Sequence, residues 1–106
     1  MSGTAAISLG SITTTELADA TVVHLAGAID AALRAEAGAA MSRSLERRLP
    51  IVLDTSDVTF MDSTGLAFLI LCSRFGQEEG LPVTLPHPPL GLAMLMQTTG
   101  VDVLFR

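Results

Sequence analysis

Acidic and small hydroxyl side chains gather in one short stretch of the chain. They are Asp54, Ser56, Asp57, Asp62, Ser63 and Thr64. The stretch follows Ile51-Val52-Leu53, a purely apolar run typical of a central strand covered on both faces. In sheets of alternating strands and helices, the loops after the strand ends carry the binding site. We therefore expect this stretch, together with the loop Gly27–Asp30, to form the functional site.

The most specific enzymatic hypothesis is phosphoryl transfer to Asp54 with bound Mg²⁺, as in a bacterial receiver domain. Such a site also needs an acidic pair after the first strand and a Lys to neutralise the acyl phosphate. The chain has no Lys, and the loop after the first strand offers only Glu16 and Asp19. The sequence disfavours this chemistry.

A serine hydrolase needs a nucleophile beside a general base. Ser63 does not lie in a Gly-x-Ser-x-Gly elbow, and the histidines are His24, within a predicted strand, and His87, in a proline-rich turn. With Cys72 on a predicted buried helix, no metal-ligand spacing is evident. We expect a binding protein that is not an enzyme.

Helix capping is the simplest interpretation of Asp62-Ser63-Thr64-Gly65. Asp or Ser at an N-cap contributes about 1 kcal/mol, so folding alone could account for them. From spacing alone, this interpretation is preferred to a functional one.

Length and composition fit one domain of 106 residues with a net charge of −5. The densest basic group is Arg43, Arg47 and Arg48, which the dipole at a helix end explains, so nucleic-acid binding is not expected. No apolar run is long enough to span a bilayer, no signal peptide is recognisable, and a single cysteine suits a reducing compartment. These features predict a cytoplasmic protein without membrane insertion.

Turn residues and hydrophobic periodicity divide the chain into eight expected elements. The strands are expected at Ala5–Thr15, Thr21–Ala26 (ended by Gly27), Ile51–Leu53, Leu81–Leu85 and Val101–Phe105. The helices are expected from Asp30 to Arg48, from Asp62 to about Arg74, and from Pro89 to Gly100. Val58 and Phe60 are expected to point into the core. The order β-β-α-β-α-β-α-β predicts an α/β fold with a mixed, mostly parallel sheet whose initial hairpin forms an antiparallel edge.

Residues Ile51–Leu66 closely resemble the signature of STAS domains, the anti-sigma factor antagonists. In that family a hydrophobic strand leads into Asp-x-Ser-x-Val-x-Phe-x-Asp-Ser-(Ser/Thr)-Gly-Leu. Two further segments are similar to family motifs, Gly27-Ala28-Ile29-Asp30 and Thr99-Gly100-Val101-Asp102-Val103-Leu104-Phe105. The resemblance runs through nearly the whole chain in order and implies a single STAS-like domain over residues 1–106.

The resemblance implies a partner-switching role. An unphosphorylated antagonist of this kind binds an anti-sigma factor, itself a serine kinase, and so frees a sigma factor. The kinase then phosphorylates the serine that corresponds to Ser63, and a serine phosphatase reverses this. No cofactor is expected, because kinase, nucleotide and metal belong to the partners. The implied partner-binding residues are Asp30, Ser56, Asp57, Met61, Asp62, Ser63, Thr64 and Gly65.

The sequence departs from the family pattern at the start of the first helix. Ala28 replaces the usual Glu, and Ala31-Ala32-Leu33 is more apolar than in many relatives. A different partner surface is one consequence. The alternative role is a STAS-type scaffold subunit of a signalling complex or lipid transporter, in which the loop around Ser63 is a fixed contact surface.

Overall fold

The computed structural model describes residues 9–105. Its strands are β1 (Ser11–Glu16), β2 (Thr21–Ile29), β3 (Ile51–Met61) and β4 (Val83–Thr84). Its α-helices are α1 (Arg34–Arg47), α2 (Ser63–Glu79) and α3 (Leu90–Thr99), and its 3₁₀ helices are η2 (Ala31–Leu33) and η3 (Val101–Phe105). None of the helices in this range has the length and hydropathy of a membrane span.

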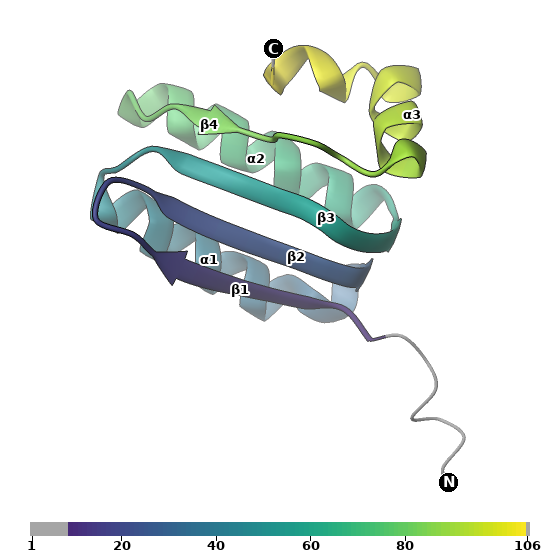
Figure 1. Ribbon diagram of the computed structural model, residues 1–106, viewed down its shortest axis with the longest axis horizontal. Helices are drawn as coiled ribbons and strands as arrows, with labels where there is room; N and C mark the ends of the chain where they lie inside the picture. Colours follow the sequence, from purple (N-terminus) through teal and green to yellow (C-terminus); the bar gives the residue numbers. More distant parts are fainter. Residues whose placement is uncertain (1–8, 106) are drawn as a thin grey trace, which may run out of the picture.

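The four strands form one sheet in the order β1-β2-β3-β4. β1 pairs with β2 antiparallel, whereas β2–β3 and β3–β4 are parallel pairs. Helices α1 and α2 cover one face of the sheet, and α3 and η3 lie beyond its β4 edge (Figure 1). The predicted α/β class and mixed, mostly parallel sheet are confirmed.

The long strand β3 changes its register with β2 at two places. His24 and Ala26 pair with Asp54 and Asp57, so three residues of β3 are matched to two of β2. The same shift recurs where Gly27 and Ala28 pair with Val58 and Phe60. An extra residue in one strand reverses the faces to which later side chains point. The buried positions along β3 are accordingly residues 51, 53, 55, 58 and 61.

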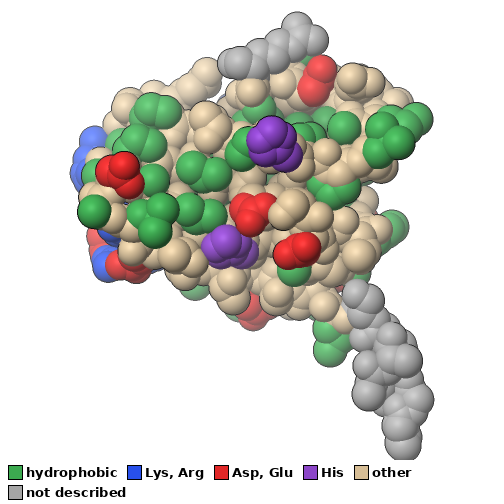
Figure 2. Space-filling view, in the orientation of Figure 1, with side chains coloured by type: hydrophobic (Ala, Val, Ile, Leu, Met, Phe, Trp, Pro, Cys, Tyr) green, Lys and Arg blue, Asp and Glu red, His purple; other side chains and the backbone are tan. Residues whose placement is uncertain are grey.

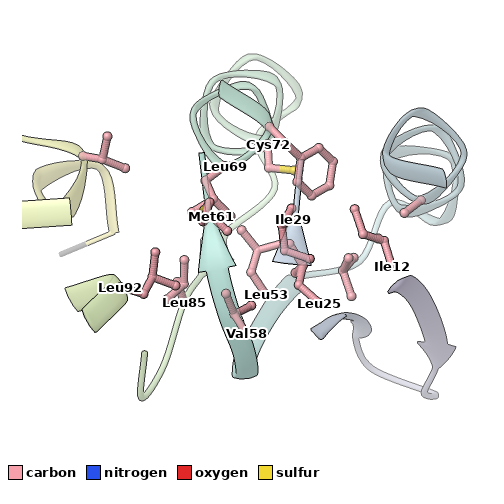
Figure 3. Packing of buried hydrophobic residues seen from close by; sticks show 14 of the residues in the cluster. Ile12, Leu25, Ile29, Leu53, Val58, Met61, Leu69, Cys72, Leu85 and Leu92 are labelled. Carbon is pink, nitrogen blue, oxygen red and sulfur yellow. The ribbon is translucent and has the colours of Figure 1, made fainter. Parts of the chain in front are cut away.

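A single apolar core lies between the sheet and the helices. Ile29, Leu53 and Leu69 are almost completely buried at its centre. Cys72 and Met61 pack beside them, and Val58, Leu85 and Leu92 extend the core towards α3 (Figure 3). The core fixes α2 against the ends of β2 and β3, and this positions the first residues of that helix.

Several predicted boundaries are wrong. The polar segment Asp54–Asp57, expected as a loop, belongs to β3, and Gly27 does not end β2 but lies within it at a φ of 71°. Phe60 is exposed instead of buried, because the second register shift turns it away from the core. Val101–Phe105, expected as a last strand, is the 3₁₀ helix η3. Of the predicted first strand, residues 5–8 lie outside the described range, residues 9 and 10 are not in a strand, and residues 11–15 belong to β1.

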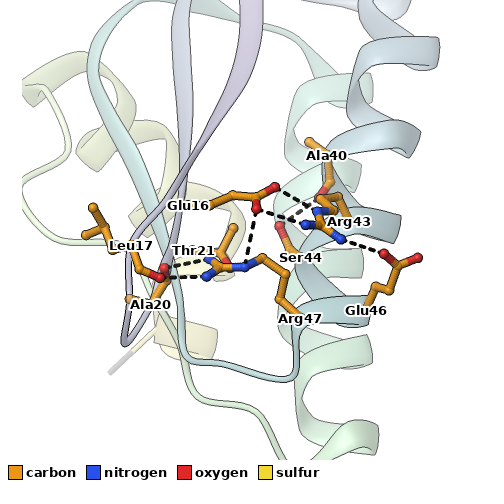
Figure 4. Close-up of polar contacts among 9 residues, drawn as sticks. All are labelled: Glu16, Leu17, Ala20, Thr21, Ala40, Arg43, Ser44, Glu46 and Arg47. Carbon is orange, nitrogen blue, oxygen red and sulfur yellow. Dashed lines mark hydrogen bonds and ion pairs between the residues drawn. The ribbon is translucent and has the colours of Figure 1, made fainter.

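The cluster of arginines at the end of α1 is engaged within the domain. Arg43 forms ion pairs with Glu16 at 2.7 Å and Glu46 at 2.6 Å. Arg47 donates to the carbonyl oxygens of Leu17 and Ala20, as well as to the hydroxyl of Thr21 (Figure 4). Arg48 pairs with Glu79 at 2.6 Å. These contacts tie α1 to the turn between β1 and β2 and to the end of α2.

Candidate functional site

Asp62 and Ser63 have different roles at the start of α2. Asp62 is the N-cap residue, and its Oδ1 accepts the backbone N–H groups of Thr64 at 2.9 Å and Gly65 at 3.1 Å. Ser63 is the first helical residue and is exposed. Because the neighbouring carboxylate caps the helix, the Ser63 hydroxyl is not needed for that purpose. The helix start therefore presents an accessible hydroxyl group.

A second capped helix start lies next to the first. Ile29 and Met61 are Cα partners at the ends of the parallel strands β2 and β3. Asp30 and Asp62 directly follow them, so the chain leaves the sheet at two neighbouring points. The carboxylate of Asp30 accepts the N–H of Ala32 at 3.0 Å and opens η2, which leads into α1. The predicted capping role of Asp30 is confirmed, although a 3₁₀ turn precedes the α-helix. Two carboxylates thus flank the position of Ser63.

Gly65 lets α2 approach the end of β2 closely. A Cβ atom at this position would lie 2.5 Å from Met61 Cγ and 2.9 Å from the carbonyl oxygen of Ile29. The backbone N–H of Asp62 also donates to that same oxygen at 3.3 Å. The glycine and this hydrogen bond together hold the helix start against the neighbouring strand.

A groove of about 430 Å³ runs between α1 and α2, and Ser63 lies at its polar end. Asp30, Arg34 and Thr64 also line that end, whereas the rest of the groove is apolar. The apolar lining includes Leu33, Ala37, Met41, Phe68 and Leu71. An apolar groove with a hydroxyl and both signs of charge at one end suits a protein segment as ligand.

The structure brings only some of the predicted site residues together. Asp30, Ser63, Thr64 and Gly65 line the groove. Met61 is buried beneath Gly65, so its side chain shapes the site from within and is not accessible to a partner. Ser56 and Asp57 are exposed within β3. Asp57 lies four residues before Met61, about 13 Å along an extended strand, because the predicted loop is a strand.

Hydrogen-bonded polar residues occupy the sheet face that α1 and α2 leave uncovered. His24 Nδ1 lies 3.0 Å from Asp54 Oδ2, and His24 Nε2 lies 3.1 Å from the hydroxyl of Thr15. Asp54 Oδ1 accepts both the backbone N–H and the hydroxyl of Ser56. Figure 2 shows histidine and acidic side chains together on this face. The Ser56 hydroxyl, the Ser56 N–H and His24, in that order, lower the pKa of Asp54.

His24 is not placed to act as a general base for Ser63. His24 precedes Ile29 by five residues, about 16 Å along an extended strand, and is held by Asp54 and Thr15. Burial raises the pKa of the Cys72 thiol to about 12, so Cys72 is not a nucleophile. Among the described residues, no group of three or more His, Cys, Asp and Glu side chains is placed to hold a metal ion.

Two residues near the site were not predicted. Phe60 is 56% exposed, two residues before Asp62, and only knowledge of the register shift in β3 could have revealed this. Arg34 is the first residue of α1 and the basic member of the groove lining. A cation at a helix start is unfavourable, so the position of Arg34 in the sequence could have indicated a role other than stabilising the helix.

Comparison with known structures gives the same fold. A crystal structure of an anti-sigma factor antagonist from Mycobacterium paratuberculosis is 25% identical, with a TM-score of 0.72 over 92% of this chain and 83% of that one. The anti-sigma factor antagonist SpoIIAA in its unphosphorylated form is 17% identical, with a TM-score of 0.77 over 91% and 86%. The Bacillus cell fate determinant SpoIIAA in the phosphorylated form is 17% identical, with a TM-score of 0.72 over 91% and 89%. At 17% identity the likeness concerns the fold alone.

The family comparison covers all the elements described above. No curated protein sequence gives a significant match. The family profile described as "Mlab, STAS domain" matches residues 12–106, from β1 through α3 and η3. Several of the structurally similar proteins are anti-sigma factor antagonists, which are regulatory binding proteins. The chain belongs to the STAS-domain family, as the sequence motifs predict.

Proposed function

We propose that this protein is an anti-sigma factor antagonist whose binding is switched by phosphorylation of Ser63. The unphosphorylated form binds an anti-sigma factor serine kinase in the cytoplasm and so releases a sigma factor. Phosphate on Ser63 ends this binding, and a serine phosphatase restores it. The observation that carries the proposal is that Ser63 is exposed at the first position of α2, while Asp62 alone supplies the cap.

The start of α2 can carry a phosphate without loss of the fold. An anion in the first turn of a helix is stabilised by about 0.3–1 kcal/mol. Ser63 is exposed, so a phosphate there displaces no core side chain. The capping hydrogen bonds of Asp62 to Thr64 and Gly65 do not involve the Ser63 hydroxyl. We therefore expect little change in the stability of the domain on phosphorylation.

The same phosphate can disrupt an interface. It adds a charge of about −1.5 to −2 beside Asp30 and Asp62. A partner carboxylate about 4 Å away would be repelled by about 4 kcal/mol per unit charge at an effective dielectric constant of 20. Changing a complex from mostly bound to mostly free requires about 5.5 kcal/mol. One added phosphate is of the right size to act as the switch.

The proposed binding surface consists of Asp30, Ser63, Thr64 and the adjoining groove. Met61 and Gly65 contribute by shaping this surface from below. Ser56 and Asp57 contribute only to a partner that also extends about 13 Å along β3. The exposed side chain of Phe60 lies between these two regions in the sequence and offers an apolar contact.

The proposal is tested by incubating the protein with a candidate anti-sigma factor serine kinase, ATP and Mg²⁺, followed by mass spectrometry. We expect one phosphate on Ser63 and none on a Ser63→Ala variant. Thr64→Ala, which removes the neighbouring hydroxyl, should still be modified. Absence of phosphate, or phosphate on another residue only, would argue against the switch.

The family profile described as "Mlab, STAS domain" favours a second candidate, a STAS-type scaffold subunit of a larger assembly. In that role the surface around Ser63 is a fixed contact. A pull-down from cells separates the two candidates. A scaffold should co-purify with its assembly whether residue 63 is Ser or Asp, whereas a switch should lose its partner in the Ser63→Asp variant.

A further inference from the structure

Arg34 and Ser63 lie near the starts of neighbouring helices, Arg34 four residues after the capping Asp30 and Ser63 directly after the capping Asp62. They are the first residues of α1 and α2, the two helices that follow the adjacent ends of β2 and β3. Both line the polar end of the groove between these helices. Of the groove-lining residues, only Asp30 and Arg34 are charged, so Arg34 supplies the positive charge on this surface.

The position of Arg34 is not explained by the stability of the fold. A cation in the first turn opposes the helix dipole. The arginines at the other end of α1 are all engaged, Arg43 and Arg47 with Glu16 and Arg48 with Glu79. Within residues 9–105, Arg34 is exposed and forms no ion pair within 4.0 Å, even with Asp30 one helical turn before it. Its guanidinium group is available for another anion.

Phosphorylation at Ser63 would create an anion at the same end of the groove. The other charged groups beside it, Asp30 at the end of β2 and Asp62 at the start of α2, would repel the phosphate. A guanidinium group presents donors in a planar fork that matches phosphate oxygens. An arginine side chain on the opposite wall of the groove is therefore the natural counter-ion.

We infer that Arg34 is the internal counter-ion for phosphate on Ser63, so that phosphorylation links the starts of α1 and α2 by an ion pair across the polar end of the groove. This inference rests on the proposed function, since it concerns the phosphorylated form. The modification then changes the binding surface in two ways. It adds negative charge, and it places a salt bridge over the entrance through which a partner segment would reach Ser63.

The test uses the full chain with phosphoserine installed at position 63 by genetic encoding, which needs no kinase. The second pKa of phosphoserine, about 6 in a free chain, is measured by ³¹P NMR titration. An arginine counter-ion lowers this pKa, so Arg34→Gln should raise it by roughly half a unit or more, and Arg34→Lys should restore most of the lowering. Thermal melts should show Arg34→Gln to destabilise the phosphorylated form and to leave the unmodified form no less stable, because the cation opposes the dipole of α1.

Arg74→Gln is the matched control. It removes the same charge from α2 at an exposed position eleven residues after Ser63, about 16 Å along the helix. An equal rise in both variants, or no rise in Arg34→Gln, would overturn the inference. That result would leave the proposed function standing, since the kinase assay on Ser63 does not depend on Arg34. Conversely, if the kinase did not phosphorylate Ser63, an effect of Arg34 on the pKa of genetically encoded phosphoserine would still support the inference.

Discussion

Asp30 and Asp62 follow paired residues at the ends of two adjacent parallel strands, and each carboxylate caps the helix that comes next. The two helix starts therefore lie next to each other at the carboxyl ends of β2 and β3. The caps satisfy the backbone groups locally and leave the outer surface free for a partner. Ser63 lies on that surface, next to both carboxylates.

The capping hydrogen bonds of Asp62 should stabilise the domain even without its negative charge. Replacement Asp62→Ala removes the acceptor for Thr64 and Gly65 and should lower the free energy of unfolding by about 1 kcal/mol, within a range of 0.5–2 kcal/mol. Asp62→Asn keeps a side-chain oxygen and should lose much less. Urea denaturation of the two variants measures the difference. Equal losses would mean that the charge, and not the hydrogen bonds, stabilises this helix start.

Gly65 should tolerate no side chain. A Cβ atom there would lie 2.9 Å from the backbone oxygen of Ile29, and backbone cannot move aside as a flexible side chain does. Gly65→Ala should therefore destabilise the domain by about 1–3 kcal/mol.

Gly38→Ala is the control for this substitution. Gly38 lies within α1, and a Cβ atom added to it meets no atom within 4 Å. The alanine should stabilise the protein by up to about 1 kcal/mol through its higher helix propensity. A Gly65→Ala variant as stable as Gly38→Ala would disprove the close packing between α2 and β2.

The sequence was sufficient to predict the elements with strong local signals. The N-caps Asp30 and Asp62, the apolar start of β3 and the glycine after α3 were all recognisable from residue type and spacing. Gly100 has a φ of 80°, as expected for the residue that ends a helix. The family motifs then indicated that Asp62 is the cap beside the serine that we propose to be phosphorylated.

Features that depend on pairing between distant strands could not be predicted. The register shifts in β3 are set by its contacts with β2. A regular alternation along residues 51–61 therefore predicted that Phe60 points into the core, whereas it is exposed. The final residues Val101–Phe105 have the apolar character of a strand, but they form a 3₁₀ helix at the edge of the molecule, and the four-stranded sheet ends at β4. Arg34 and Ser63 are 29 positions apart, and only the groove between α1 and α2 reveals their proximity.

Thr55 carries a buried hydroxyl whose oxygen has no hydrogen-bond partner among the described residues. An unsatisfied buried polar group costs about 1–3 kcal/mol, so Thr55→Val, which keeps the shape, should stabilise the domain by about 1 kcal/mol. Thr55→Ser keeps the hydroxyl but removes a methyl group and should destabilise it. Thermal or urea unfolding of both variants checks this. A destabilised Thr55→Val variant would show that the hydroxyl has a partner after all.

Acid should destabilise the protein partly through Asp54. Its pKa is lowered in the folded state, chiefly by the Ser56 hydroxyl and then by the Ser56 N–H and His24. A carboxyl whose pKa falls on folding contributes stability above its unfolded pKa of 3.8, and this contribution is lost as the pH falls through the folded value.

Ser56→Ala removes the largest cause of that shift. The variant should be less stable than the parent near neutral pH and should approach it below about pH 3. We expect a difference under about 1 kcal/mol, because the Asp54 side chain is 35% exposed. Thr59→Ala, at another exposed position of β3, should show a difference that does not depend on pH. A constant difference for Ser56→Ala as well would refute the assignment.

Phosphate on Ser63 is proposed to switch binding without unfolding the domain. The most direct measurement is calorimetric titration of the anti-sigma factor kinase that phosphorylates Ser63 with the unmodified chain and with the chain carrying phosphoserine at position 63, together with the melting temperature of each chain. We expect the phosphorylated chain to bind about 10⁴-fold more weakly, as a full switch requires, and to melt within a few degrees of the unmodified one. Equal affinities, or a phosphorylated chain that is already unfolded at the temperature of the titration, would contradict the proposal.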